Sequence, residues 1–173
     1  LSIAPSPLDS NVIWVGTDDG NVQVTRDGGK TWTNVTPNIA AAGLGSDAWV
    51  SNIDASPSDA GTAYVAADHH QDDDYAPYAF VTTDFGATWR RISGDLPKGW
   101  VHVVREDPKN KNLLYAGTEV GLFASWDRGA HWFPIRGDLP PVPVRDLFVH
   151  PRDNDLVIGT HGGLAVAGRQ LDA

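Results

Sequence analysis

A motif of eight residues occurs three times along this chain of 173 residues. The copies occupy residues 25–32, 82–89 and 125–132, and each reads Ser/Thr-x-Asp-x-Gly-x-(Thr/His)-Trp. Their Asp residues are separated by 57 and 43 positions. Three such matches in one chain predict a structural unit that is repeated along the sequence.

Apolar, β-branched segments surround the motifs in a constant order. One segment lies upstream of each motif and a fourth lies near the C-terminus, at residues 12–17, 63–67, 114–118 and 156–160. Each follows a segment that ends in proline, at residues 49–57, 100–108 and 143–151, with a remnant at residues 3–7. Gly, Asp, Asn and Pro fill the turns between them. One unit therefore has four short strands and recurs about every 45 residues.

These units predict the fold class. No segment has a convincing helical period, so we expect an all-β chain with almost no helix. Four-stranded units with this spacing are typical of β-propeller blades. We predict one propeller segment over residues 1–173, with blades at about residues 1–36, 49–93, 100–136 and 143–173.

Two features predict that the blades form an arc of a larger ring. Four blades are the small extreme for a closed propeller. The first unit keeps only the end of its first strand, the fourth lacks the motif, and the chain begins at Leu1 without a Met. We therefore expect an excerpt of a longer protein, or a processed product. Its terminal blade faces would contact the remainder of the propeller or a second copy.

The motif itself has a structural interpretation. It lies on the predicted hairpin between the third and fourth strands, where its Gly can adopt a positive φ. The Asp can accept hydrogen bonds from turn amides, and the Trp can pack between neighbouring blades. We assign this folding role to Asp27, Trp32, Asp84, Trp89, Asp127 and Trp132.

Composition excludes several kinds of function. With 13 basic and 22 acidic residues the formal charge is −9 at pH 7, which disfavours binding to nucleic-acid phosphates. No apolar run has the length of a membrane span. The absence of Cys excludes disulfides, thiol catalysis and Cys-ligated zinc.

The motif and the segments at residues 12–20 and 156–162 resemble the Asp-box (BNR) repeat. That repeat occurs in sialidases, xyloglucan-type glycoside hydrolases, sortilin-like Vps10 domains and a photosystem II assembly factor. The segments are most similar to bacterial secreted proteins of the sortilin-like and glycosyl-hydrolase-like kinds, which implies an extracytoplasmic location, secreted or periplasmic. The families differ in what they bind, so the resemblance implies a fold and leaves the catalytic residues unassigned.

A set of ionisable residues is predicted on one face of the propeller. Aligning the units puts Asp18, Asp68, Glu119 and His161 at one position, just after the second strand. The resemblance implies that ligands bind on this face, around the central channel. Such residues either bind a sugar, a cation or a basic peptide, or form turns. Glycoside hydrolysis would need two carboxylates about 5 to 10 Å apart. Asp18 with Asp19, or Glu119 with Asp146, would supply such a pair if the blades bring them close.

The longest insertion, at residues 68–78, is rich in carboxylates and aromatic rings. Asp72, Asp73 and Asp74 suit Ca²⁺. His69 and His70 with an Asp suit Zn²⁺ instead, and the remaining alternative is a solvated acidic loop. Tyr75 and Tyr78 either stack on sugar rings or anchor the loop to its blade. No cofactor is required, and Ca²⁺ in the loop at residues 68–74 is the metal that we would expect.

We expect a non-catalytic binding or scaffold propeller that recognises a glycan or a protein, because the scaffold repeats occur without a catalytic signature. The alternative is a glycoside hydrolase with a sialidase-like or xyloglucanase-like scaffold, which would use carboxylates on the loop-bearing face. A third hypothesis is an assembly role in which the arc packs on a partner.

Overall fold

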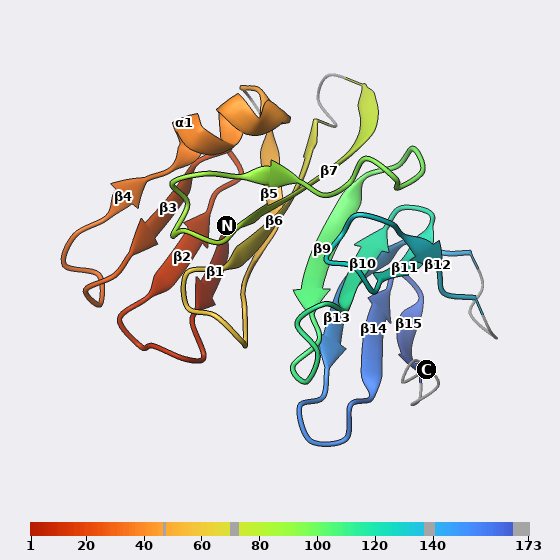
Figure 1. The fold of residues 1–173 in the computed structure, drawn as a ribbon. Coiled ribbons are helices and arrows are strands. Elements are labelled where there is room, and N and C mark those ends of the chain that lie inside the picture. Colours follow the sequence, from red (N-terminus) through yellow and green to blue (C-terminus); the bar gives the residue numbers. More distant parts are fainter. Residues whose placement is uncertain (47, 70–72, 137–140, 168–173) are drawn as a thin grey trace.

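The computed structural model describes residues 1–46, 48–69, 73–136 and 141–167. Within them, four antiparallel sheets, here called blades 1 to 4, follow one another along the chain, and the strands of each pair in sequence order (Figure 1). Blade 1 contains β1 (Ser2–Pro5), β2 (Ile13–Gly16), β3 (Val22–Thr25) and β4 (Thr33–Asn34). Blade 2 contains β5 (Trp49–Ala55), β6 (Ala63–His69), β7 (Asp74–Thr82) and β8 (Arg90–Arg91). Blade 3 contains β9 (Val101–Glu106), β10 (Leu114–Thr118), β11 (Gly121–Ser125) and β12 (Phe133–Pro134). Blade 4 contains β13 (Val144–Val149), β14 (Leu156–Thr160) and β15 (Gly163–Ala167).

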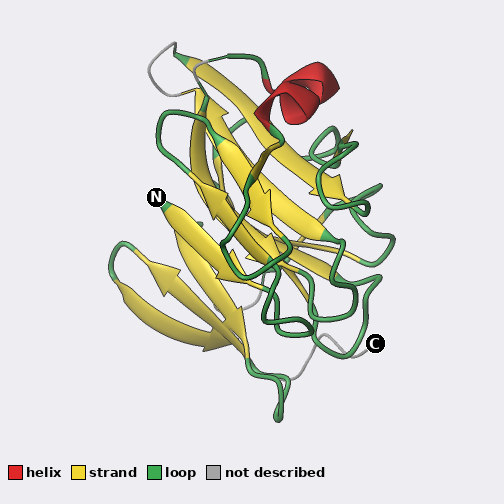
Figure 2. Cartoon of the chain, turned by 90° about the vertical axis from the view of Figure 1, so that its left-hand side faces the viewer, coloured by secondary structure: helices red, strands yellow, loops and turns green. Residues whose placement is uncertain are grey.

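The first strands of the blades lie side by side in series. β1 contacts β5, β5 contacts β9, and β9 contacts β13. Together they line a groove of about 470 Å³ that runs along the inner edge of the blades. The view in Figure 2, turned by 90°, shows strands joined by loops, with a single short helical segment. The expected all-β arrangement of blades is confirmed, and the order of contacts is that of an arc.

Each of the three apolar cores joins two successive blades. The first core contains Trp14 and Ile53, the second contains Tyr64 and Trp132, and the third contains Tyr115 with side chains of blade 4. Because the middle strands are covered on both sides, every residue of β6 and β10 is buried. This double coverage explains their continuous apolar sequences, which lack the alternation of a half-exposed strand.

A short helical segment lies between blades 1 and 2, in a chain for which almost no helix was expected. It comprises α1 (Thr36–Ile39), which has a proline in its first turn, and the wider turn η1 (Ala40–Leu44). Ile39 and Leu44 are buried against the first core. Nine residues are too few to display a clear helical period, which is why the sequence did not reveal this segment. None of the helical residues among those described forms a segment with the length and apolar character of a bilayer span.

The three motifs form the same hydrogen-bonded turn. In the first, the Asp27 carboxylate accepts hydrogen bonds from the Thr31 amide at 2.9 Å and from the hydroxyls of Thr31 and Thr25 at 2.6 and 2.8 Å. The amide of Gly29 donates to the Thr25 hydroxyl at 2.9 Å. These bonds, chiefly those from Thr31, lower the pKa of Asp27 to about 2. Asp84 and Asp127 accept the corresponding bonds, the latter from the His131 ring nitrogen in place of a hydroxyl.

Each motif of blades 2 and 3 is docked on the preceding blade. A Cβ atom added at Gly86 would lie 2.8 Å from Val35, and one added at Gly129 would lie 2.7 Å from Ile92. Only glycine permits this close approach at these positive-φ positions. In blade 1, the corresponding Trp32 is 41% exposed. Among the described residues, the side of blade 1 that carries Trp32 is therefore left partly uncovered.

Candidate functional site

The face that carries the β2–β3, β6–β7, β10–β11 and β14–β15 turns, here called the loop face, presents a pair of stacked aromatic rings. Tyr75, near the start of β7, and Trp100, just before β9, have ring centroids 5.3 Å apart and an interplanar angle of 19°. Tyr75 is 52% exposed. The Trp100 indole nitrogen donates to the carbonyl of Asp74 at 3.0 Å, and the Gly99 amide donates to the carbonyl of Tyr75 at 2.8 Å. The pair therefore joins blade 2 to the start of blade 3 in a fixed geometry.

A cluster of charged side chains adjoins the aromatic pair. The amide of Glu119, in the β10–β11 turn, donates to the carbonyl of Trp100 at 2.9 Å. The Glu119 carboxylate lies 2.7 Å from Nε2 of His102 on β9 and 3.9 Å from Nη2 of Arg145 on β13. Arg145 is half-exposed, Glu119 is partly exposed and His102 is nearly buried. Aromatic stacking surface, a carboxylate and a guanidinium thus lie next to one another across blades 2, 3 and 4.

The four aligned ionisable residues have different surroundings. Glu119 belongs to the cluster just described, whereas Asp18 and His161 are turn residues, and His161 is exposed. Asp68 was expected just after the second strand, but it lies within β6, buried and opposite Trp49. In blade 2 the pairing of β6 with β7 extends as far as His69 and Asp74, so Asp68 becomes part of the strand.

The insertion separates the two tyrosines into different roles. The Tyr78 hydroxyl donates to the Asp74 carboxylate at 2.6 Å, and this bond raises the pKa of Tyr78 and lowers that of Asp74. The Tyr78 ring also packs edge-on against His69 and under the guanidinium of Arg91. Tyr78 anchors the hairpin to its blade, whereas Tyr75 presents its ring to solvent.

The metal prediction lies partly outside the described residues, which do not include His70 or Asp72. Asp73 is exposed and has φ 54°, and the Asp74 carboxylate accepts bonds from Tyr78 and from the Ala76 amide. Within the described ranges, no group of three His, Asp or Glu side chains is arranged to hold a metal ion. Ca²⁺ in the loop at residues 68–74 stays a prediction.

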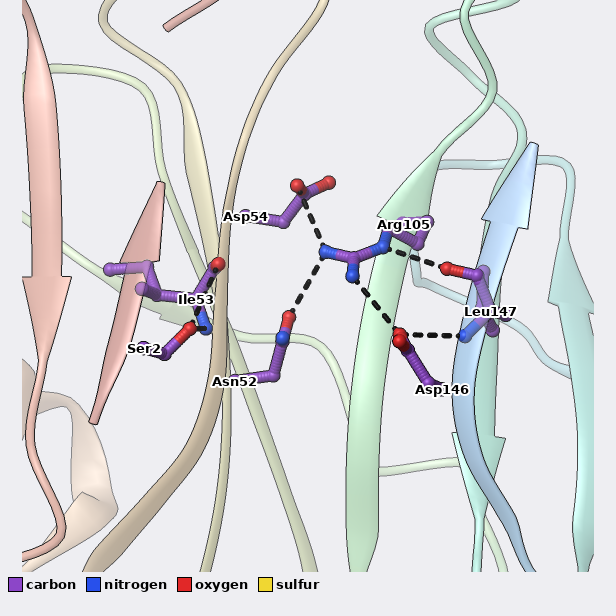
Figure 3. A network of polar contacts seen from close by, with 7 residues as sticks. All are labelled: Ser2, Asn52, Ile53, Asp54, Arg105, Asp146 and Leu147. Atoms are coloured by element: carbon purple, nitrogen blue, oxygen red, sulfur yellow. Dashed lines mark hydrogen bonds and ion pairs between the residues drawn. The ribbon is translucent and has the colours of Figure 1, made fainter. Parts of the chain in front are cut away.

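A second polar network lies in the groove between the first strands (Figure 3). Nη1 of Arg105, on β9, lies 2.9 Å from the Asp54 carboxylate and donates to the Asn52 amide oxygen at 3.2 Å, both on β5. Nη2 lies 3.2 Å from the Asp146 carboxylate, and Nε donates to the Leu147 carbonyl at 3.0 Å, both on β13. One guanidinium therefore ties together three blades.

The two carboxylates bound to Arg105 have different environments. Asp54 is partly buried, with 24% of its side chain exposed, and the loss of solvation outweighs the attraction of Arg105 and raises the pKa of Asp54 to about 6. Asp146 is 72% exposed along its side chain. Two carboxylate pairs were considered from the sequence. In the first, Asp18 with Asp19, the Asp19 carboxylate accepts a hydrogen bond from the Thr17 hydroxyl within its turn, and this bond lowers the pKa of Asp19. Asp146 was considered with Glu119, but the structure joins it to Arg105 and so to Asp54.

Sequence reasoning missed Trp100, Arg105 and Arg145 as functional candidates. Trp100 and Arg145 lie at or just before the start of a first strand, where the blades converge. Both positions lie in the aligned segments at residues 100–108 and 143–151, but an alignment does not show which side chains of different blades meet.

No known protein-family profile matches the sequence. Over 101 residues the chain is 35% identical to a probable oligoxyloglucan-reducing end-specific xyloglucanase of Neosartorya fischeri, and over 100 residues it is 32% identical to an oligoxyloglucan-reducing end-specific xyloglucanase of Emericella nidulans. Each match covers 57% of this chain and 11% of the relative. The matched region is thus about a tenth of the length of these curated relatives.

Solved β-propeller structures share the fold. The GH74 xyloglucanase of Xanthomonas campestris superposes with a TM-score of 0.72 at 20% identity, over 96% of this chain and 28% of that one. YCF48 bound to D1 peptide superposes with a TM-score of 0.68 at 18% identity, over 98% of this chain and 51% of that one. At these identities the likeness shows the fold alone, and the chain is a β-propeller segment.

Proposed function

We propose that this chain forms part of a larger extracytoplasmic β-propeller whose loop face binds a glycan through Tyr75 and Trp100. The observation that carries the proposal is the exposed ring of Tyr75 stacked on the partly buried Trp100, with Glu119 and Arg145 beside them. Aromatic rings offer flat apolar surfaces to the C–H faces of sugars, while charged side chains orient the sugar hydroxyls.

The names of the relatives support xyloglucan as the ligand. The two curated relatives are named for action on xyloglucan, and a solved structure with the same fold is also a xyloglucanase. The extracytoplasmic location rests on the resemblance of the motif segments to secreted proteins of the Asp-box kind. The uncovered Trp32 face, and the small share of each relative that the chain matches, support additional blades that complete the ring.

The test is a titration of the chain with xyloglucan oligosaccharides in an isothermal titration calorimeter, which measures the affinity. Tyr75→Ala removes the exposed ring, and we expect about tenfold weaker binding, a change of about 1.4 kcal/mol. Phe133→Ala is the matched control, because Phe133 is equally exposed but lies on the outer strand β12. Absence of saturable binding, or equal weakening by both substitutions, would contradict the proposal.

Glycoside hydrolysis is the second candidate function, and the Asp54–Arg105–Asp146 arrangement favours it. It places a carboxyl group with a raised pKa and an exposed carboxylate on either side of one guanidinium in a groove. Glycosidases use one carboxyl group as an acid and a second carboxylate as a base or nucleophile. Release of reducing ends from xyloglucan, lost in Asp54→Asn and Asp146→Asn, would establish hydrolysis. Binding without release would leave the non-catalytic function.

A further inference from the structure

A pocket of about 360 Å³ lies between blades 2 and 3, on the face that carries the motifs and so opposite the loop face. Thr83, Thr88 and Trp89 of the second motif line one side, and Arg128 of the third motif lines the other. Arg90 of β8 and the hydroxyl-bearing Tyr64 complete it. Nothing in the glycan proposal uses this pocket.

The pocket exists because two motif positions differ between the blade boundaries. Between blades 1 and 2, the guanidinium of Arg26 lies 3.6 Å from the ring centroid of Phe85 and fills the space. At the next boundary the equivalent residues are Thr83 and Arg128. Thr83, in the place of Arg26, is shorter and leaves the space open. Arg128, in the place of the Phe85 ring, adds a positive charge to that of Arg90.

The charge of the pocket is opposite to that of the chain. Among the described residues, no lining side chain carries a carboxylate, and neither Arg90 nor Arg128 has an ion-pair partner. In the described part of the chain, the Arg90 guanidinium donates to the backbone carbonyl of Arg128, at 3.4 Å. The nearby Glu106 carboxylate is occupied by the hydroxyls of Ser58 and Tyr64. Two permanently charged groups thus share one pocket in a chain of net charge −9.

We propose that this pocket binds a small oxyanion group, such as a phosphate, sulfate or carboxylate, between Arg90 and Arg128. The anion relieves the repulsion between the two guanidiniums and accepts charge-assisted hydrogen bonds from both. The Thr83 hydroxyl supplies a further donor, and the Trp89 ring forms an apolar wall beside it.

In the experiment, the intact chain is titrated separately with inorganic phosphate, sulfate and acetate at constant ionic strength. Heteronuclear NMR measures the chemical shifts of the backbone amides at each step. We expect saturable shifts of residues around Arg128 with at least one of these anions, and the strongest arm identifies the oxyanion. Arg90→Gln and Arg128→Gln should each weaken binding about tenfold to a hundredfold, which corresponds to the loss of one charged hydrogen bond. Arg152→Gln removes an exposed positive charge elsewhere and should leave the affinity unchanged.

Two results would overturn the proposal. One is the absence of saturable binding of all three anions in the millimolar range. The other is equal weakening by Arg152→Gln and Arg128→Gln, which would show a general charge effect. Because Arg90 is exposed and Arg128 is partly exposed, both variants should fold, and an unchanged melting temperature without anion checks this.

Discussion

The indole nitrogen of Trp132 donates a hydrogen bond to the carbonyl oxygen of Ile92, 2.6 Å away across the boundary between blades 2 and 3. The backbone amide of Trp132 also donates to the Asp95 carboxylate at 2.9 Å. At the previous boundary, Trp89 contacts Trp14 edge-on with ring centroids 6.2 Å apart. The tryptophans of the second and third motifs therefore connect blades 2 and 3 to the blade that precedes each of them.

The first prediction ranks the tryptophans of the three motifs by the stability that is lost when each is replaced by alanine. Trp132 is 5% exposed, Trp89 is partly buried and Trp32 is 41% exposed. Trp132→Ala should lower the free energy of unfolding by about 3 to 5 kcal/mol, because it removes a fully buried aromatic side chain. Trp89→Ala should cost less, and Trp32→Ala least. Urea unfolding of the three variants measures the order, and equal losses in all three would contradict the docking of each motif on its preceding blade.

The second prediction uses two glycines at equivalent positions of the second strands. A Cβ atom at Gly117 would lie 2.6 Å from the Val144 carbonyl of the next blade, whereas one at Gly159 would meet only Asp146, at 3.6 Å. Gly117→Ala should therefore cost about 1 to 3 kcal/mol through overpacking. Gly159→Ala should be neutral or slightly stabilising, because it restricts the unfolded chain. Thermal unfolding of this chain compares the two, and a larger loss for Gly159→Ala would refute the interpretation.

The third prediction concerns the pair His131 and Asp127. Their hydrogen bond is the largest cause that raises the pKa of His131 above 6.5 and lowers that of Asp127 to about 2. The histidine contribution is complete below pH 6.5 and is lost as the pH rises through the raised pKa. The aspartate contribution is complete above pH 3.8 and is lost as the pH falls through about 2.

His131→Thr introduces the residue that the other two motifs have at this position, Thr31 and Thr88. This variant should keep the hydrogen bond to Asp127 but lose the decline in stability above pH 6.5. Melting temperatures recorded between about pH 5 and pH 9 cover the titration of the histidine. Parallel curves for the variant and the unmodified chain would rule out the pair as the source of the decline.

The fourth prediction concerns Asp54. Its pKa is raised from 3.8 to about 6, mainly by burial, so the folded state binds its proton more tightly than the unfolded state. Its contribution to stability is complete below pH 3.8 and is lost as the pH rises through about 6, with a total of about 3 kcal/mol at most. Asp54→Asn should flatten this fall. The matched control Asp153→Asn lies outside the Arg105 network and should retain it, and a fall that persists unchanged in Asp54→Asn would disprove the assignment.

Much of the fold was predictable because it repeats. The spacing of the motifs, the strand segments and the prolines each pointed to a four-stranded unit, and the structure has that unit in blades 1 to 3. The helical segment at residues 36–44 was not predictable, since its stability comes from burying Ile39 and Leu44 against a core built by other segments. The site was predicted only in part: Glu119 and Tyr75 lie in it, whereas Asp68 is buried in a strand.

The sequence by itself determined the local chemistry of each turn. A motif contains its own hydrogen-bond donors and acceptors within eight residues, so Asp27, Asp84 and Asp127 form the same turn in three blades. Only the tertiary structure decided which side chains of different blades meet. Arg105 reaches Asp54 and Asp146, and Tyr75 stacks on Trp100, because strands far apart in the chain converge at the inner edge of the propeller. Such contacts depend on the angle between blades, which is set by packing across all three cores and by no short segment of sequence.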